Sequence, residues 1–208
     1  MVDESIYRKR IKSVSILLDK YNLECILLNK AETIKYLTGA NNMCSWLFIT
    51  RDNKTVALVL ESDYKEYSKQ SIIEDIRTFR THEPIKLWRD LITEFRLQEK
   101  SLAIEQYHLR IFYYVILEKI FGSIINLDAE ADFIVDEARC IKEKDEIEKI
   151  KNVSTLALKV MNFINNSIKK DESEIDLLNK ILNKIYSENK NINAQIFIGT
   201  DERSALAH

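Results

Sequence analysis

The hydrophobic positions of the first part of the chain alternate between helical stripes and short buried runs. Residues 5–21 carry apolar side chains at helical spacing and predict an amphipathic helix; they are Ile6, Ile11, Val14, Leu17 and Leu18. Residues 24–28 form a short apolar run and predict a buried strand. A helical turn is expected over residues 33–37, ended by Gly39, because glycine suits the left-handed position that follows a helix.

The same alternation continues to about residue 127. Two runs rich in β-branched and aromatic residues, Ser45–Thr50 and Thr55–Leu60, flank a polar turn and predict a hairpin. Beyond the hairpin we expect helices over 64–71, 85–95 and 109–121, and strands over 76–79, 101–105 and 123–127. Short strands between longer helices predict an α/β fold with a mixed sheet flanked by helices.

The remainder of the chain has a different pattern. The charged run Asp128–Asp132 is expected to end a first domain, residues 1–130, and to begin a second segment, residues 131–208. That segment predicts a long amphipathic helix over 144–168 and a second helix that begins within 171–174, with the apolar stripe Ile175, Leu178, Leu182 and Ile185. Residues 193–198 predict a strand ended by Gly199. Two helices and one strand are too few to cover their own apolar faces.

Charge and composition exclude several classes of function. The 208 residues carry a formal net charge of −2, and lysines are interleaved with acidic residues, which argues against a nucleic-acid or anionic-membrane surface. The acidic N-terminus is not followed by an apolar core, so no signal peptide is expected. Cys25, Cys44 and Cys140 are widely spaced without a CxxC motif, which favours reduced thiols in a cytoplasmic protein.

Few side chains offer catalytic or metal-binding chemistry. Asp128, Glu130 and Asp132 alternate as ligands on a strand would, but a solvated boundary segment is the favoured interpretation. Asp201 and Glu202, near His208, form either a small metal patch or a polar turn after Gly199, and the turn is favoured. His82 and His108 stand alone and are interpreted as surface or partly buried histidines. No Ser/His/Asp or Cys/His signature and no phosphate-binding glycine loop occurs.

Four aromatic residues gather near the start of the helix expected over residues 109–121. They are Tyr107, Phe112, Tyr113 and Tyr114. They are either a recognition surface or part of the core, and their apolar surroundings favour core packing.

Several motifs in order resemble the creatinase, prolidase and aminopeptidase P group of "pita-bread" metallopeptidases. Residues 10–28 are similar to the opening helix and strand of the group's N-terminal domain. The other matching motifs are Tyr36-Leu37-Thr38-Gly39, Leu102-Ala103-Ile104-Glu105, Arg139-Cys140-Ile141-Lys142 with 146–151 after it, and the segment from Gly199 to His208. Three positions depart from the group's pattern: Asp171 stands where glycine is frequent, Ala207 where proline is usual, and Glu143 where serine is frequent.

The resemblance implies a fold, a reaction and a role for one residue. It implies a creatinase-type N-terminal domain over 1–130 and an incomplete pita-bread domain over 131–208. The N-terminal domain is expected to mediate dimerisation and to form one wall of the active site. In the group, two divalent metal ions (Mn, Co or Zn) activate water for hydrolysis of a peptide bond, commonly before proline. The metal ligands lie after the position of His208, and the histidine at that position hydrogen-bonds substrate and the tetrahedral intermediate.

The resemblance therefore predicts the N-terminal part of a metal-dependent Xaa-Pro dipeptidase or aminopeptidase. It also implies a homodimer formed through the N-terminal domain, with proline-containing peptides as substrates. The 208 residues alone are expected to lack the metal ligands and to be inactive. The alternative is a non-catalytic, peptidase-like module that binds a peptide or protein. Prolidase, aminopeptidase P and creatinase-like specificities are not separated by this sequence.

Overall fold

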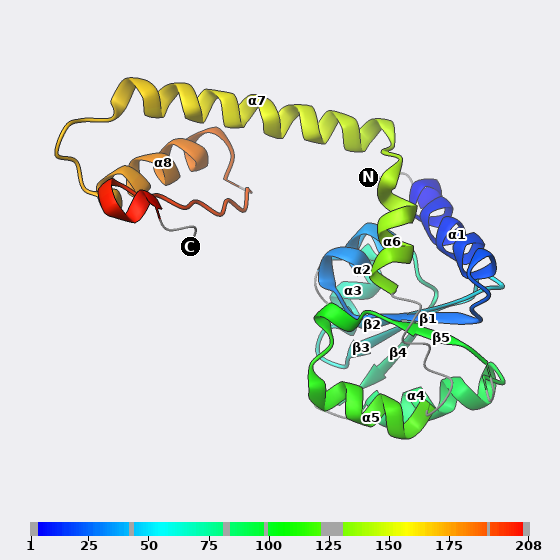
Figure 1. Cartoon of the computed structure of the whole chain (residues 1–208). Coiled ribbons are helices and arrows are strands. Elements are labelled where there is room, and N and C mark those ends of the chain that lie inside the picture. The colour runs from blue at the N-terminus through cyan, green and yellow to red at the C-terminus, as the bar shows by residue number, and fades with distance from the viewer. Residues whose placement is uncertain are drawn as a thin grey trace. The chain divides into compact units, whose positions relative to one another are not determined.

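The chain forms two compact units, which comprise residues 1–141 and 142–208. The computed structural model describes residues 4–41, 44–80, 84–97, 100–121, 131–190 and 192–205. Each unit has its own elements and its own apolar core (Figure 1).

A mixed five-stranded sheet forms the centre of the first unit. Its strands are β1 (Cys25–Leu28), β2 (Cys44–Thr50), β3 (Thr55–Leu60), β4 (Asp75–Phe79) and β5 (Leu102–Ile104), in the order β4-β3-β2-β1-β5. The β1–β2 and β2–β3 pairs are antiparallel, whereas β3–β4 and β1–β5 are parallel. The predicted hairpin and the mixed α/β sheet are confirmed, and the strand expected over 123–127 lies outside the described residues.

Helices cover both faces of the sheet (Figure 1). On one face lie α1 (Glu4–Lys20), α2 (Ala31–Thr38), α3 (Tyr64–Gln70) and α6 (Ala131–Cys140). On the other face lie α4 (Pro84–Glu94) and α5 (Ile111–Phe121). The central strands are therefore buried on both sides. In β1, Ile26 and Leu28 join the first core while Cys25 and Leu27 join the second, as the period-2 geometry of a strand requires.

Gly39 ends α2 as the sequence predicts. Its φ of 81° places it in the left-handed region, and its N–H donates to the carbonyl of Lys35 at 2.9 Å. A Cβ at this position would lie 2.8 Å from the Tyr7 ring. Both the backbone conformation and the close approach of α1 therefore favour glycine here.

Helix α6 belongs to the first unit. It buries Ala131, Ile134 and Val135 in the core that α1 and α2 share with the sheet. Glu137 accepts hydrogen bonds from Lys20 Nζ at 2.6 Å and from the Tyr21 hydroxyl at 2.5 Å. The boundary expected at residue 130 falls just before α6, whereas these contacts extend the compact unit to Ile141.

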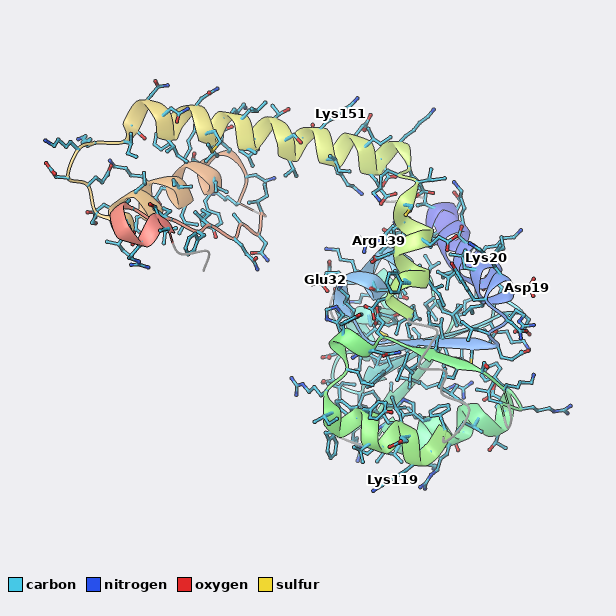
Figure 2. All side chains as sticks on the ribbon, viewed as in Figure 1. Asp19, Lys20, Glu32, Lys119, Arg139 and Lys151 are labelled. Atoms are coloured by element: carbon cyan, nitrogen blue, oxygen red, sulfur yellow. The ribbon has the colours of Figure 1, made fainter. Side chains whose placement is uncertain are left out.

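The end of α6 is held by an aromatic contact. The Arg139 guanidinium, labelled in Figure 2, lies 5.0 Å from the centre of the Tyr36 ring on α2. Arg10 on α1 lies 4.2 Å from the same ring centre and donates to the Tyr36 carbonyl at 3.1 Å. Two guanidinium groups thus contact one tyrosine, which links three helices through cation–π interactions.

The second unit consists of α7 (Lys144–Ser167) and α8 (Glu174–Glu188), followed by an irregular segment. Its buried residues in the described part are Val160, Leu177, Ile181 and Ile185. A capping box at Glu143 and Glu146 starts α7, and the Ser173 hydroxyl accepts from the Asp176 N–H at the start of α8. Both helices were predicted from the sequence.

Two details of the second unit differ from the prediction. The apolar stripe of α8 is shifted, because Ile175 is 62% exposed and Leu177, Ile181 and Ile185 are the residues that are buried. The strand expected over residues 193–198 is wrong, since residues 192–200 have no regular structure. A strand needs hydrogen bonds from a neighbouring strand, and the described part of this unit offers none.

Candidate functional site

The predicted site residue, His208, lies outside the described residues. The structure describes the segment that approaches it as far as Ala205, within the 3₁₀ helix η3 (Asp201–Ala205). The contacts that hold the segment before His208 in place define the candidate site.

Glu174, the first residue of α8, anchors the segment before His208. Its Oε1 accepts from the Thr200 backbone N–H at 2.9 Å and from the Thr200 hydroxyl at 3.2 Å. Its Oε2 lies 2.8 Å from Nη1 of Arg203. The hydrogen bond from the Thr200 backbone is the main cause that holds the pKa of Glu174 below its ordinary value. Glu174 is thus ionised at neutral pH and ties residues 200–203 to the start of α8.

The turn between Gly199 and η3 is tight. The Arg203 N–H donates to the Thr200 carbonyl at 3.0 Å. A Cβ on Gly199 would lie 3.1 Å from the carbonyl oxygen of Arg203, so a larger residue would displace the segment that Glu174 holds.

Asp171 is one of the residues that depart from the family pattern, and its backbone conformation explains why aspartate is tolerated there. Its φ is 63°, which lies in the left-handed region. Glycine adopts this conformation without strain, while Asp is one of the few other residues that tolerate it. The turn before α8 therefore keeps its backbone conformation although the frequent glycine is missing.

Only some of the acidic residues considered as metal ligands lie within the described part of the chain. Asp128 and Glu130 lie outside the described residues. Asp132 lies on α6 rather than on a strand, and its side chain is largely buried, so the prediction of a solvated residue is wrong for this position. Its burial follows from the packing of α6 against the sheet. Asp201 and Glu202 lie in η3, which confirms the predicted turn after Gly199.

The histidine and cysteine candidates form no catalytic group in the described chain. His82 lies outside that part, and His108 is a partly exposed residue whose Nε2 lies 3.9 Å from Oδ1 of Asp132. Cys25 and Cys44 are buried, Cys140 is exposed, and none of the three forms a disulfide bond among the described residues. Burial raises the pKa of the Cys44 thiol to about 11 and also raises that of Cys25, so neither is a thiolate at neutral pH.

No group of three or more His, Cys, Asp or Glu side chains in the described ranges is placed to hold a metal ion. None of the described helices has both the length and the apolar character needed to cross a membrane.

The aromatic cluster divides between core and surface. Tyr113 and Tyr114 pack partly buried against the second core, as predicted. Tyr107 is 73% exposed and Phe112 is 62% exposed, so core packing is wrong for these two residues. A helix that is apolar on all sides buries only the face that meets the sheet, and spacing alone does not identify that face.

An apolar groove of about 730 Å³ lies within the second unit. It runs between α7, α8 and the irregular segment 192–199, and its lining includes Val153, Met161, Ile181, Ile196 and Phe197. The sequence predicted uncovered apolar faces on these helices, and Val153, Met161 and Phe197 are indeed exposed.

The fold defines an α/β class in which a mixed five-stranded sheet is covered by helices on both faces. The protein-family model described as the creatinase/prolidase N-terminal domain matches residues 10–141, which is more than half of the chain. The chain therefore belongs to this family. No curated protein sequence matches it.

Solved structures agree with this fold. A prolidase from Thermococcus sibiricus matches with a TM-score of 0.76 and 22% identity, covering 88% of this chain and 50% of that one. A Xaa-Pro dipeptidase from Bacillus anthracis matches with a TM-score of 0.74 and 17% identity, covering 88% and 49%. A Xaa-Pro aminopeptidase chain from Streptococcus pyogenes matches with a TM-score of 0.56 and 17% identity. The match covers 66% of this chain and all of that shorter one. The chain thus spans about half the length of the two longer structures.

Proposed function

We propose that the chain is the N-terminal part of a metal-dependent Xaa-Pro dipeptidase or aminopeptidase. The observation that carries this proposal is the family match over residues 10–141, together with the similarity to a prolidase and a Xaa-Pro dipeptidase that continues beyond that domain. The substrate class is a short peptide with proline after its first residue. A cytoplasmic location is part of the proposal and is supported by three cysteines that form no disulfide bond among the described residues.

The first domain, residues 1–130 in the sequence-based division, is proposed to mediate homodimerisation and to wall the active site. Exposed apolar side chains support a contact role for this domain. Ile111 and Phe112 both project from the start of α5, and Tyr107 precedes them in the 3₁₀ helix η1 (Gln106–His108). Burying such side chains against a second copy would remove apolar surface from water.

His208 is proposed to hydrogen-bond the substrate and to stabilise the tetrahedral intermediate. Glu174 supports this role as a positioning residue, because it fixes Thr200 and Arg203 in the segment that leads to His208. Two divalent metal ions (Mn, Co or Zn) are implied for the longer enzyme by its family. Among the described residues, no set of side chains is placed to hold such ions.

The 208-residue chain alone is expected not to hydrolyse Xaa-Pro dipeptides, because its described residues provide no site for a metal-activated water. The measurement is release of free proline after incubation with Mn²⁺ or Co²⁺, with EDTA as the control. Turnover that rises in proportion to the protein and disappears with EDTA would contradict this expectation.

The alternative function is a non-catalytic module that binds a peptide or protein. The apolar groove between α7 and α8 is the observation that favours it. The two proposals differ in the state of the isolated chain. A stable, monodisperse chain supports the module, whereas aggregation, or proteolysis back to about residue 135, supports an incomplete enzyme whose groove needs further residues to cover it.

A further inference from the structure

The irregular segment that follows α8 has backbone groups without partners. Residues 192–198 alternate between half-buried and exposed positions, which is the pattern of an extended chain with one face on the protein. In the described part of the chain, the backbone N–H and C=O groups of this segment make no hydrogen bond. The segment therefore resembles an edge strand that has no neighbouring strand. Its half-buried residues, which pack against the core of the second unit, are Ile192, Ala194, Ile196 and Ile198.

The segment carries none of the charges or prolines that keep an edge strand from pairing. Residues 191–200 are all uncharged and include no proline, whereas natural sheets protect their edges with such residues. The edge strand β4 of the first unit shows the contrast, because its Arg77 forms ion pairs with Asp75 and with Glu94, each at 2.7 Å. Residues 192–198 are thus open to the addition of a further strand.

The charges at the two ends of the segment favour one partner. Lys190, which is exposed, precedes the segment, and Asp201 and Glu202 follow it. In an antiparallel pair of two copies, the basic start of each segment lies beside the acidic end of the other, so opposite charges meet at both ends. The neutral residues between these ends bring no like charges together. A second copy of this chain therefore matches the segment in charge as well as in backbone pairing.

We propose that residues 192–198 pair as an antiparallel β-strand with the same segment of a second copy of this chain. A register that sets Ile192 opposite Ile198 places the apolar side chains of both copies on one face, because opposite residues of an antiparallel pair point to the same side. The helices α7 and α8 of both copies cover that face, and alternate N–H groups of each segment donate to carbonyls of the other.

This contact goes beyond the proposed function. It lies in the second unit, so it is separate from the dimer contact proposed for the first domain, and it does not rest on hydrolase activity.

Hydrogen exchange of the full chain, measured by mass spectrometry at two protein concentrations, tests the proposal. The amides of residues 193–198 are expected to exchange about tenfold more slowly at about 200 μM than at about 1 μM, because pairing between copies protects them from solvent. Fast exchange at both concentrations would mean that the segment stays unpaired. Equal protection at both would mean that the chain covers the segment itself. Either result would overturn the proposal.

Phe197→Lys distinguishes this contact from association through the first unit. Phe197 is 63% exposed, and lysine on an edge strand is a device by which natural sheets prevent pairing. At the higher concentration the variant should lose the protection of residues 193–198. Its weight-average mass in sedimentation equilibrium should fall by about twofold or more, because one of the contacts between copies is lost.

Leu158→Lys is the matched control, because Leu158 is 65% exposed on α7 of the same unit and does not line the groove. It should keep the wild-type mass and the wild-type protection. Equal masses for Phe197→Lys and the wild type would overturn the proposal. The exchange measurement on the wild-type chain decides the question even if a variant folds poorly.

Discussion

Replacing Trp88 by alanine is expected to destabilise the first unit by about 3–5 kcal/mol. Trp88 is fully buried between α4 and the sheet. Its ring meets Trp46 edge-on at a centroid distance of 5.0 Å and Tyr113 at 6.2 Å. The variant loses the buried ring together with these aromatic contacts, which add to the stability that burial alone provides. Urea unfolding followed by circular dichroism and by the fluorescence of Trp46 measures the change.

Trp88→Phe is the matched control for this variant. Phenylalanine keeps an aromatic ring in the core and removes the indole N–H, which is buried without a hydrogen-bond partner in the described structure. Trp88→Phe should therefore lower the free energy of unfolding by clearly less than Trp88→Ala does. Equal urea midpoints of unfolding for Trp88→Ala and the wild type would contradict the burial of Trp88 in this core.

Ile181→Ala is expected to unfold the second unit while the first unit stays folded. Ile181 is one of four residues buried in the described core of that unit, and removing such a side chain costs about 2–5 kcal/mol. So small a core is not expected to withstand that loss. Limited proteolysis should cleave the variant after residue 141 faster than the wild type, whereas the tryptophan fluorescence, which reports the first unit, should match that of the wild type.

Ile175→Ala changes the same residue type on the same helix at an exposed position. It should leave the proteolysis pattern as in the wild type. If the two variants were cleaved alike, the assignment of the buried face of α8 would be wrong.

The sheet was predictable because its central strands are buried on both faces and are bounded by polar turns. The run Thr55–Leu60 is apolar nearly throughout, and the polar residues 51–54 before it mark the hairpin. Such a run is distinguished from a buried helix by its short length, its polar boundaries and its content of β-branched residues. Gly39 also predicted the end of α2, because glycine readily adopts the left-handed conformation that the structure shows there.

The buried face of α8 was not predictable from spacing alone. Leu177 and Leu178 are adjacent, as are Ile181 and Leu182, so two overlapping stripes fit the same helix. The packing against α7 decides between them. The segment 193–198 has the composition of a strand, but its pairing depends on a neighbour that the sequence of the segment does not specify.

Polar contacts between residues far apart in the chain were not predictable from the sequence. Glu174 and Thr200 are 26 residues apart, and Glu105 approaches Lys30 across 75 residues. Nothing in the local pattern indicates such pairs, because each depends on how separate elements are brought together by the fold. The family resemblance identified the motif that contains Glu105, and the sequence predicted a helix start at residues 171–174, while only the structure shows what the Glu105 and Glu174 carboxylates bind.

A chimera tests the central claim, that this chain is the N-terminal part of a Xaa-Pro hydrolase. Residues 1–208 would replace the matching half of the Thermococcus sibiricus prolidase, and hydrolysis of a Xaa-Pro dipeptide with Mn²⁺ or Co²⁺ would be measured. Metal-dependent turnover is expected, with kcat lowered about 10²–10³-fold by His208→Ala. A chimera that folds and binds metal but hydrolyses no Xaa-Pro dipeptide would contradict it.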